Sequence, residues 1–268
     1  MRRMSIIALF SIFITVWPVF ASIQEHQSSN DIKSVKQTYK SLRDEASYVY
    51  VDGKEVARRI RFVQPEDNVV EDYDKLQQIA LIRHGEPDLY KSGRFSRDEA
   101  VEYMLCYDTA CIIKPDAPFF MLKEQEEVKV FASPLNRALS TAHYVCGPDK
   151  EITVSRDFRE FETYLNAKGK KPRLRMPIKY WTTTARIKWA LGFKAAEGVE
   201  NYSQAKKRAR KAARTLVESA EENHKSMLFG HGMLNHYIKK ELEKMGWQIV
   251  EDTGNDYFGT SILVKINS

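Results

Sequence analysis

The sequence predicts an α/β domain with a mostly parallel central sheet. Short, continuous apolar runs recur along the chain, as expected of strands that are buried on both faces. Helical patterns separate these runs, and such an alternation of strands and helices is typical of a parallel sheet covered by helices. With 268 residues, of which 43% are hydrophobic and 29% charged, the chain is long enough to bury a sizeable core.

The first 21 residues have the composition of a secretory signal peptide. Arg2 and Arg3 precede an apolar run from Ser5 to Phe20, and small residues favour cleavage after Ala21. The alternative is an uncleaved membrane anchor, but this run falls short of the roughly 18–20 residues that cross a bilayer. We therefore expect an exported protein, periplasmic or secreted, with no stable membrane insertion after cleavage.

The charge, the cysteines and the histidines give no indication of a nucleic-acid-binding protein or of a zinc protein. Removal of the signal segment leaves 40 Lys and Arg against 36 Asp and Glu, a net charge near +4. This mild excess does not by itself indicate nucleic-acid binding, and it would not repel an anionic substrate. The three cysteines (Cys106, Cys111 and Cys146) allow one disulfide at most, with Cys106 and Cys111 as the candidate pair. No spacing of Cys or His indicates a zinc site, so we expect no metal.

Residues 22–75 are expected to form a leader and a small N-terminal extension. The polar stretch from Ser22 to about Ser34 favours a tether. After it, the run Tyr48–Val51, the turn Asp52-Gly53 and a second run ending at Val63 are typical of a β-hairpin.

The main domain is expected to span residues 76–268. Its predicted strands are Ile79–Ile82, Val128–Ala132, Ile152–Val154, Met227–Phe229 and Ser261–Ile266, and its predicted helices are Ser96–Met104, Arg137–Val145, Tyr202–Ala220 and Leu234–Met245. Ligands of such sheets bind beyond the carboxyl ends of the strands.

Charged and titratable residues come directly after four of the predicted strands. Because the carboxyl ends of parallel strands meet at one edge of a sheet, these residues are expected to converge. They are Arg83 and His84 after the first strand, Ser133 and Arg137 after the second, Glu160 after the third and His231 after the fourth.

Two histidines, two arginines and a carboxylic acid suit phosphoryl transfer from an ester to nitrogen. Arg83 and Arg137 carry permanently charged forks that match the geometry of phosphate, and the start of the helix at Arg137 adds a favourable dipole. A neutral imidazole at His84 can attack phosphorus. The two arginines help to keep it neutral because they disfavour its protonated form.

The remaining candidates have supporting roles. His231 would donate a hydrogen bond to the charge that develops on the transferring group. Glu160 would protonate the leaving alkoxide and then, once ionised, activate water, and Glu162 is the alternative acid. Ser133 either binds phosphate or shapes the turn before Pro134. Glu86 either contacts the pocket or caps the segment that follows it.

Three stretches of the chain resemble the histidine phosphatase superfamily, in its phosphoglycerate-mutase-like branch (branch 1). These are Leu81–Glu86 (LIRHGE), Ser133–Ala138 (SPLNRA) followed by Thr141-Ala142, and Phe229–Gly232 (FGHG). The run Phe158-Arg159-Glu160 is similar to the acid motif of the family. The resemblance covers roughly Leu76 to the C-terminus.

This resemblance implies a three-layer α/β/α sandwich with a phosphate pocket. It also implies a metal-independent phosphomonoester hydrolase that acts through a phosphohistidine on His84, needs no cofactor and takes a small-molecule phosphate ester. Pro87 and Tyr90 stand where the mutases of the family tend to carry Thr or Ser and Asn, which counts against mutase activity. A cofactor-dependent phosphomutase and a non-catalytic phospholigand-binding module are the alternatives.

Two basic stretches need a separate interpretation. Lys168–Arg175, with Tyr180-Trp181 and Trp189 after it, lies where this family inserts a substrate-covering segment, so it is either a lid or a solvated loop with aromatic anchors on the core. Lys206–Arg214 is expected to form the exposed face of a helix, and no aromatic platform for nucleic acid accompanies it.

Overall fold

The structure is a computed structural model that describes residues 29–90, 92–123, 126–161, 165, 174–192 and 199–267. The predicted signal peptide and its cleavage position after Ala21 lie outside these residues, as does the alternative acid Glu162. Within the described residues, no helix is long and apolar enough to span a membrane.

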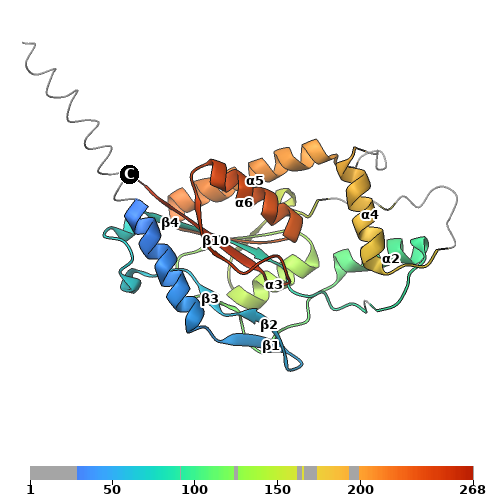
Figure 1. Cartoon of the computed structure of the whole chain (residues 1–268), viewed down its shortest axis with the longest axis horizontal. Helices are drawn as coiled ribbons and strands as arrows, with labels where there is room; N and C mark the ends of the chain where they lie inside the picture. Colours follow the sequence, from blue (N-terminus) through green and yellow to red (C-terminus); the bar gives the residue numbers. More distant parts are fainter. Residues whose placement is uncertain are drawn as a thin grey trace, which may run out of the picture.

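A mixed sheet of six strands forms the centre of the described part of the chain (Figure 1). Neighbouring strands follow the order β7 (Ile152–Val154), β6 (Lys129–Ala132), β8 (Lys225–Gly230), β4 (Leu76–Arg83), β10 (Thr260–Ile266) and β9 (Gln248–Asp252). The first four strands are mutually parallel, whereas β10 is antiparallel to both β4 and β9. The predicted mostly parallel sheet is thus confirmed, with β9 as an edge strand that was not predicted.

Helices cover both faces of this sheet, which confirms the α/β/α sandwich. Along β4, Ile79 and Leu81 pack in the cluster beneath α5 (Tyr202–Asn223) and α6 (Gly232–Lys244). Ala80 and Ile82 pack in the opposite cluster, since successive side chains of a strand point to opposite faces. That second face is covered by α3 (Asn136–Cys146) and by a helix at residues 29–44 (Figure 1). Seven of the eight residues of β4 are therefore buried, and Arg83 at its end is half-buried.

The N-terminal extension packs on the main domain. The predicted hairpin is present as β1 (Tyr48–Val51) and β2 (Lys54–Arg58), while β3 (Ile60–Arg61) pairs in parallel with β5 (Phe120–Met121). A tether was expected up to Ser34, but residues 29–44 are helical. Val35 and Tyr39, four residues apart on one helix face, are completely or almost completely buried, and this apolar stripe outweighs the polar composition around it.

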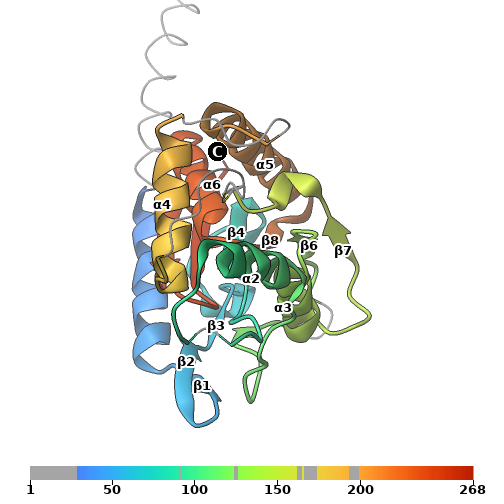
Figure 2. The same ribbon diagram turned by 90° about the vertical axis from the view of Figure 1, so that its right-hand side faces the viewer.

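Two further helices, α2 (Arg97–Thr109) and α4 (Ile178–Ala190), lie together at one end of the molecule (Figures 1 and 2). Ser96 and Glu99 form a capping box that fixes the start of α2. Phe95 forms a bridge with Met176, and its carbonyl accepts a hydrogen bond of 2.9 Å from the indole of Trp181. These contacts join α2 and α4 into one unit.

Short 3₁₀ turns complete the fold at Pro65–Asp67, Tyr73–Lys75 and Arg156–Phe158.

The three cysteines are free thiols, so Cys106 and Cys111 are not bridged. Both are exposed, whereas Cys146 is half-buried at the end of α3.

Candidate active site

Parallel pairing of β4 with β8 brings the two predicted catalytic histidines together. In this pairing Arg83 lies opposite Gly230, so His84 and His231 are each the next residue beyond a strand end. Their ring centroids are 5.1 Å apart in an edge-to-face arrangement, and both side chains are buried. The backbone N–H of His84 also donates to the carbonyl of Gly230 at 3.1 Å. The edge of the sheet thus fixes the relative position of the two imidazoles.

The ring of His84 is held from both of its nitrogens. Nδ1 lies 2.7 Å from the carbonyl oxygen of Gly85, and Nε2 lies 3.2 Å from Nε of Arg137. Since a carbonyl only accepts and a guanidinium only donates, Nδ1 carries the proton and Nε2 presents its lone pair. His84 is therefore a neutral imidazole whose Nε2 points toward a cation.

Arg137 is the second residue of α3 and is itself buried. Its Nη1 donates to the backbone carbonyl of Tyr107 and to the carboxylate of Asp108, both at 2.9 Å, and its guanidinium lies 4.5 Å from the centroid of the Tyr107 ring. These contacts join α3 to the C-terminal end of α2. Asp108 is half-exposed, so an anion at Arg137 can compete with it from the solvent side.

Gly85 follows His84 because no larger residue fits there. A Cβ at this position would overlap the ring of Phe258. The N–H of Gly85 donates to Oγ1 of Thr141 at 2.9 Å, and the N–H of Phe258 donates to the carbonyl of His84 at 3.3 Å. The chain after His84 is thus packed directly onto the loop between β9 and β10.

His231 is completely buried and takes part in a short chain of hydrogen bonds. Its Nε2 lies 2.8 Å from Oγ of Ser133, which accepts from the N–H of Leu135 at 3.3 Å. Ser133 therefore contacts the second histidine and shapes the start of α3. Burial, and then the positive charge of Arg137, lower the pKa of His231 well below its ordinary value, so this imidazole is neutral near pH 7.

Arg83 completes a cluster of four side chains with His84, Arg137 and His231, which is called the cluster from here on. Its guanidinium lies 4.5 Å from the centroid of the Tyr257 ring, and Nη1 donates to the carbonyl of Asn255. Two buried polar atoms of the cluster, Nε of Arg83 and Nδ1 of His231, have no hydrogen-bond partner among the described residues. Because buried polar groups are normally satisfied, these atoms mark a position suited to an anionic, hydrogen-bonding ligand.

Glu160 lies at the N-terminus of α6, immediately beyond His231. Its carboxylate accepts hydrogen bonds from the backbone N–H groups of Met233 at 3.4 Å and Leu234 at 3.1 Å. A carboxylate is favoured there by the helix dipole. The structure therefore brings the predicted acid to the helix that follows the second histidine, where it also caps that helix.

Glu86 is the second residue after His84, in the loop that follows β4. Its backbone carbonyl accepts from the N–H of Ile113 at 2.8 Å. Burial, followed by the nearby Tyr257, Tyr107 and Glu86, raises the pKa of Tyr103 to about 12. The Glu86 carboxylate is thus close to the tyrosines of α2 at the rim of the cluster.

Arg208 was not among the predicted site residues. It was expected on an exposed helix face, yet its side chain is buried. It donates to the carbonyls of Asp157 at 2.9 Å and Arg159 at 2.7 Å and pairs with the carboxylate of Glu200 at 2.7 Å. It therefore supports the segment that carries Glu160.

A signal for Arg208 was present in the sequence. Ala205 and Ala212 lie three and four residues from it, and this spacing puts Arg208 on the apolar face of the helix. Its neighbours Lys206, Lys207, Arg210, Lys211 and Arg214 are exposed, as expected.

The segment expected to cover the substrate is only partly described. Lys168, Lys170, Lys171 and Arg173 lie outside the described residues, whereas Arg175 forms an ion pair of 2.9 Å with Glu99. Trp181 and Trp189 are buried and Tyr180 is exposed. Trp189 packs in the core cluster with Phe161 and Trp181 contacts Phe95, while the choice between a lid and a solvated loop stays a prediction.

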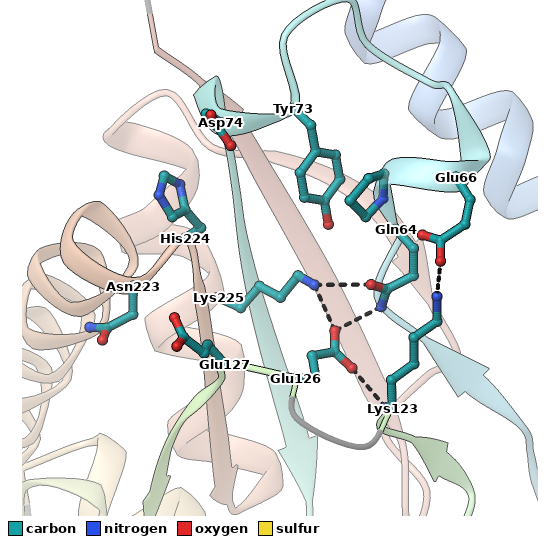
Figure 3. Close-up of a pocket in the computed structure, with 11 residues that line it drawn as sticks. Gln64, Glu66, Tyr73, Asp74, Lys123, Glu126, Glu127, Asn223, His224 and Lys225 are labelled. Carbon is teal, nitrogen blue, oxygen red and sulfur yellow. Dashed lines mark hydrogen bonds and ion pairs between the residues drawn. The ribbon is translucent and has the colours of Figure 1, made fainter.

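One surface cavity of the described structure lies away from His84 and His231, whereas another is lined in part by Tyr257 and Phe258, beside His84. One, of about 360 Å³, is at the start of β8 (Figure 3), and the other, of about 380 Å³, lies beside Glu251. In the first, the buried Lys225 contacts Glu126 at 2.7 Å and Gln64 at 3.3 Å. Burial raises the pKa of Glu126, but these hydrogen bonds outweigh it, and the pKa lies below its ordinary value. The network is internally satisfied and belongs to the opposite edge of the sheet.

An α/β/α sandwich with paired histidines and two arginines at one sheet edge defines a class of phosphoryl-transfer proteins. The chain belongs to the histidine phosphatase superfamily (branch 1), whose family model matches residues 79–265. The residues that the structure describes contain no group of three or more His, Cys, Asp and Glu side chains that could hold a metal ion.

Solved structures similar to this chain include several phosphatases. A mycobacterial glucosyl-3-phosphoglycerate phosphatase is 18% identical, with 70% of this chain and 90% of that chain covered and a TM-score of 0.40. A protein described as mycobacterial hydrolase 2 is 17% identical (72% and 84% covered, TM-score 0.42), and a phosphoserine phosphatase from Entamoeba histolytica is 16% identical (71% and 96% covered, TM-score 0.38). A search of curated proteins finds no match.

The lowered pKa of His231 predicts a specific loss of stability in acid. Below about pH 6.5 an unfolded histidine binds a proton, whereas the native His231 does not. The unfolded state then binds more protons, so the free energy of unfolding falls as pH decreases, by up to about 1.4 kcal/mol per pH unit from this residue.

Urea unfolding of the wild type and of His231→Gln between pH 5 and pH 8 measures this effect. The variant keeps an acceptor toward Ser133 but cannot titrate, so its free energy of unfolding should depend less on pH than that of the wild type below pH 6.5. Parallel pH profiles would show that His231 is not held neutral in the native state.

Proposed function

We propose that this protein is an exported phosphomonoesterase that transfers phosphate from an ester to Nε2 of His84 and then to water. The observation that carries the proposal is the orientation of His84, with Nδ1 at the carbonyl of Gly85 and Nε2 beside the guanidinium of Arg137. A lone pair at Nε2 can form a bond to phosphorus. The adjacent cation attracts the phosphate to that nitrogen.

Arg83, Arg137 and His231 provide the charge and the donors that a phosphate dianion needs. Arg83 and Arg137 bind the non-bridging oxygens through their guanidinium groups. If the hydroxyl of Ser133 donates to Nε2 of His231, Nδ1 carries the proton, and this buried atom without a described partner donates to the phosphoryl group. Such donors act most strongly where water is excluded.

The reaction proceeds in two displacements. Nε2 of His84 forms a bond to phosphorus as the phosphorus–oxygen bond of the ester breaks, and Glu160 gives its proton to the leaving alkoxide. A water molecule then attacks the phosphohistidine, and the Glu160 carboxylate takes the proton of that water. The phosphorus–nitrogen bond breaks, which releases phosphate and restores neutral His84.

Replacement of the nucleophile tests the proposal. The variant His84→Ala is expected to lower kcat/KM on p-nitrophenyl phosphate by about 10³-fold or more, because no other group in the cluster replaces the imidazole. His143→Ala, an exposed histidine on α3, is the matched control and should behave as the wild type. Full activity of His84→Ala would contradict the proposal.

A panel of alkyl phosphates, sugar phosphates and phosphoglycerates, assayed with and without chelator, separates the alternatives. Free phosphate as product, unaffected by chelator, supports a metal-independent hydrolase. An isomerised ester would identify a phosphomutase. Phosphate binding without any turnover would identify a phospholigand-binding module.

The role of Glu160 can be separated from its role as a helix cap. In Glu160→Gln the amide oxygen still accepts from the N–H of Leu234, but the proton is lost. We expect kcat/KM, which reports the first displacement, to fall by about 10²–10⁴-fold on an alkyl phosphate and much less on p-nitrophenyl phosphate, whose leaving group needs no proton. Equal losses of kcat/KM on both substrates, together with a lower urea midpoint, would show that Glu160 acts only as a helix cap. Glu162 would then be the candidate acid.

We also propose that export follows cleavage after Ala21. Expression of the full chain in a Gram-negative host should yield a mature protein outside the cytoplasm whose first residue is Ser22. N-terminal sequencing measures this directly. An intact N-terminus in the membrane fraction would instead identify residues 1–21 as an anchor.

A further inference from the structure

Two tyrosines from distant parts of the chain flank the nucleophile. Tyr107 comes from the last turn of α2 and Tyr257 from the loop between β9 and β10. Their ring centroids lie 6.2 Å and 5.7 Å from that of His84, and the Tyr107 hydroxyl forms a hydrogen bond with Tyr257. The pair therefore spans the cluster as one connected unit beside His84.

Each of these rings also covers one of the two arginines. Tyr257 lies 4.5 Å from the guanidinium carbon of Arg83, and Tyr107 lies 4.5 Å from that of Arg137. At these distances the face of the ring attracts the cation. A guanidinium that stacks on a fixed ring keeps its plane, and the plane sets the direction of its N–H groups.

Backbone contacts from the same two segments hold the same two arginines. The carbonyl of Tyr107 accepts from Nη1 of Arg137 at 2.9 Å, and the carbonyl of Asn255, two residues before Tyr257, accepts from Nη1 of Arg83. Each arginine is thus fixed at its edge by a carbonyl and at its face by a ring. Nε of Arg137 remains directed at His84 and Nε of Arg83 is buried without a described partner.

The loop that carries Tyr257 is itself rigidly seated. The next residue, Phe258, is buried with its ring against the position of Gly85 and has φ of +62°. This left-handed conformation is unfavourable for a non-glycine residue, and packing of the Phe258 ring offsets the cost. The side chains of these two consecutive residues therefore point in different directions. Phe258 packs in the core, and Tyr257 lies beside His84.

We propose that Tyr107 and Tyr257 are positioning residues that hold the guanidinium groups of Arg137 and Arg83 in the orientation that a phosphoryl group requires. This inference rests on the proposed phosphomonoesterase function. It adds a requirement for the tyrosine rings themselves, because a ring against the face of a guanidinium restrains rotation of its plane in addition to the hydrogen bonds at its edge. Burial raises the pKa of Tyr107 above its ordinary value, so its ring stays a neutral phenol.

Paired substitutions separate the ring from the hydroxyl. Tyr107→Phe and Tyr257→Phe keep the stacking face, whereas Tyr107→Leu and Tyr257→Leu remove it. Tyr90→Leu is the matched control, since Tyr90 follows the same strand end but is 81% exposed. Calorimetric binding of inorganic phosphate and of vanadate, an analogue of the transferring phosphoryl group, measures the site without any need for turnover.

We expect each Leu variant to bind vanadate about tenfold more weakly than the wild type, a change of about 1.4 kcal/mol. Binding of phosphate should weaken less than binding of vanadate, because the orientation of the guanidinium groups matters most for the five-coordinate geometry that vanadate imitates. Each Phe variant should stay within about threefold of the wild type, and Tyr90→Leu should be unchanged. A general loss of folding would lower both affinities equally and shift the urea midpoint.

The outcomes distinguish this inference from the proposed function. Leu variants that bind vanadate as the wild type does would overturn the positioning role while leaving hydrolysis at His84 intact. Weakened vanadate binding in a protein with no turnover would support the positioning role and overturn the hydrolase. A wild type that binds neither oxyanion would overturn both.

Discussion

The parallel pairing of β4 with β8 is the constraint on which the rest of the site depends. It places His84 and His231 at adjacent strand ends with their rings 5.1 Å apart, although 146 residues separate them in the sequence. β6 pairs with β8 on the other side, so α3 begins at the same edge and delivers Arg137 to Nε2 of His84. The sheet thus sets the orientation of His84, and the helix that follows β6 supplies the neighbouring cation, Arg137.

Elements outside the sheet then fix the orientation of the side chains that follow the strand ends. α2 supplies Tyr107 and Asp108 to Arg137, and the loop between β9 and β10 supplies Tyr257 to Arg83. On the far side, Arg208 of α5 holds the segment that carries Glu160. The cluster is therefore supported from three directions, which is what preorganised binding of a highly charged group requires.

The sequence predicts the sheet, its helices and the residues at the strand ends because these depend on local pattern. Continuous apolar runs identified β4 and β8, and the second residue after each run is His84 or His231. Tyr257 could not be predicted, since it lies in a loop whose path is set by Phe258 packing against Gly85. The helix at residues 29–44 was missed because two buried residues, Val35 and Tyr39, outweigh a polar composition. The burial of Arg208 could have been predicted from the spacing of the alanines around it.

The most direct test of the central claim is to trap the covalent intermediate. The mature protein is mixed with a ³²P-labelled phosphate ester, quenched rapidly in alkali, which preserves the acid-labile phosphorus–nitrogen bond, and digested for peptide mapping. The account predicts label on the peptide that contains His84, absent from His84→Ala and lost on exposure to acid. Turnover without any labelled histidine, or label on another residue that survives acid, would contradict it.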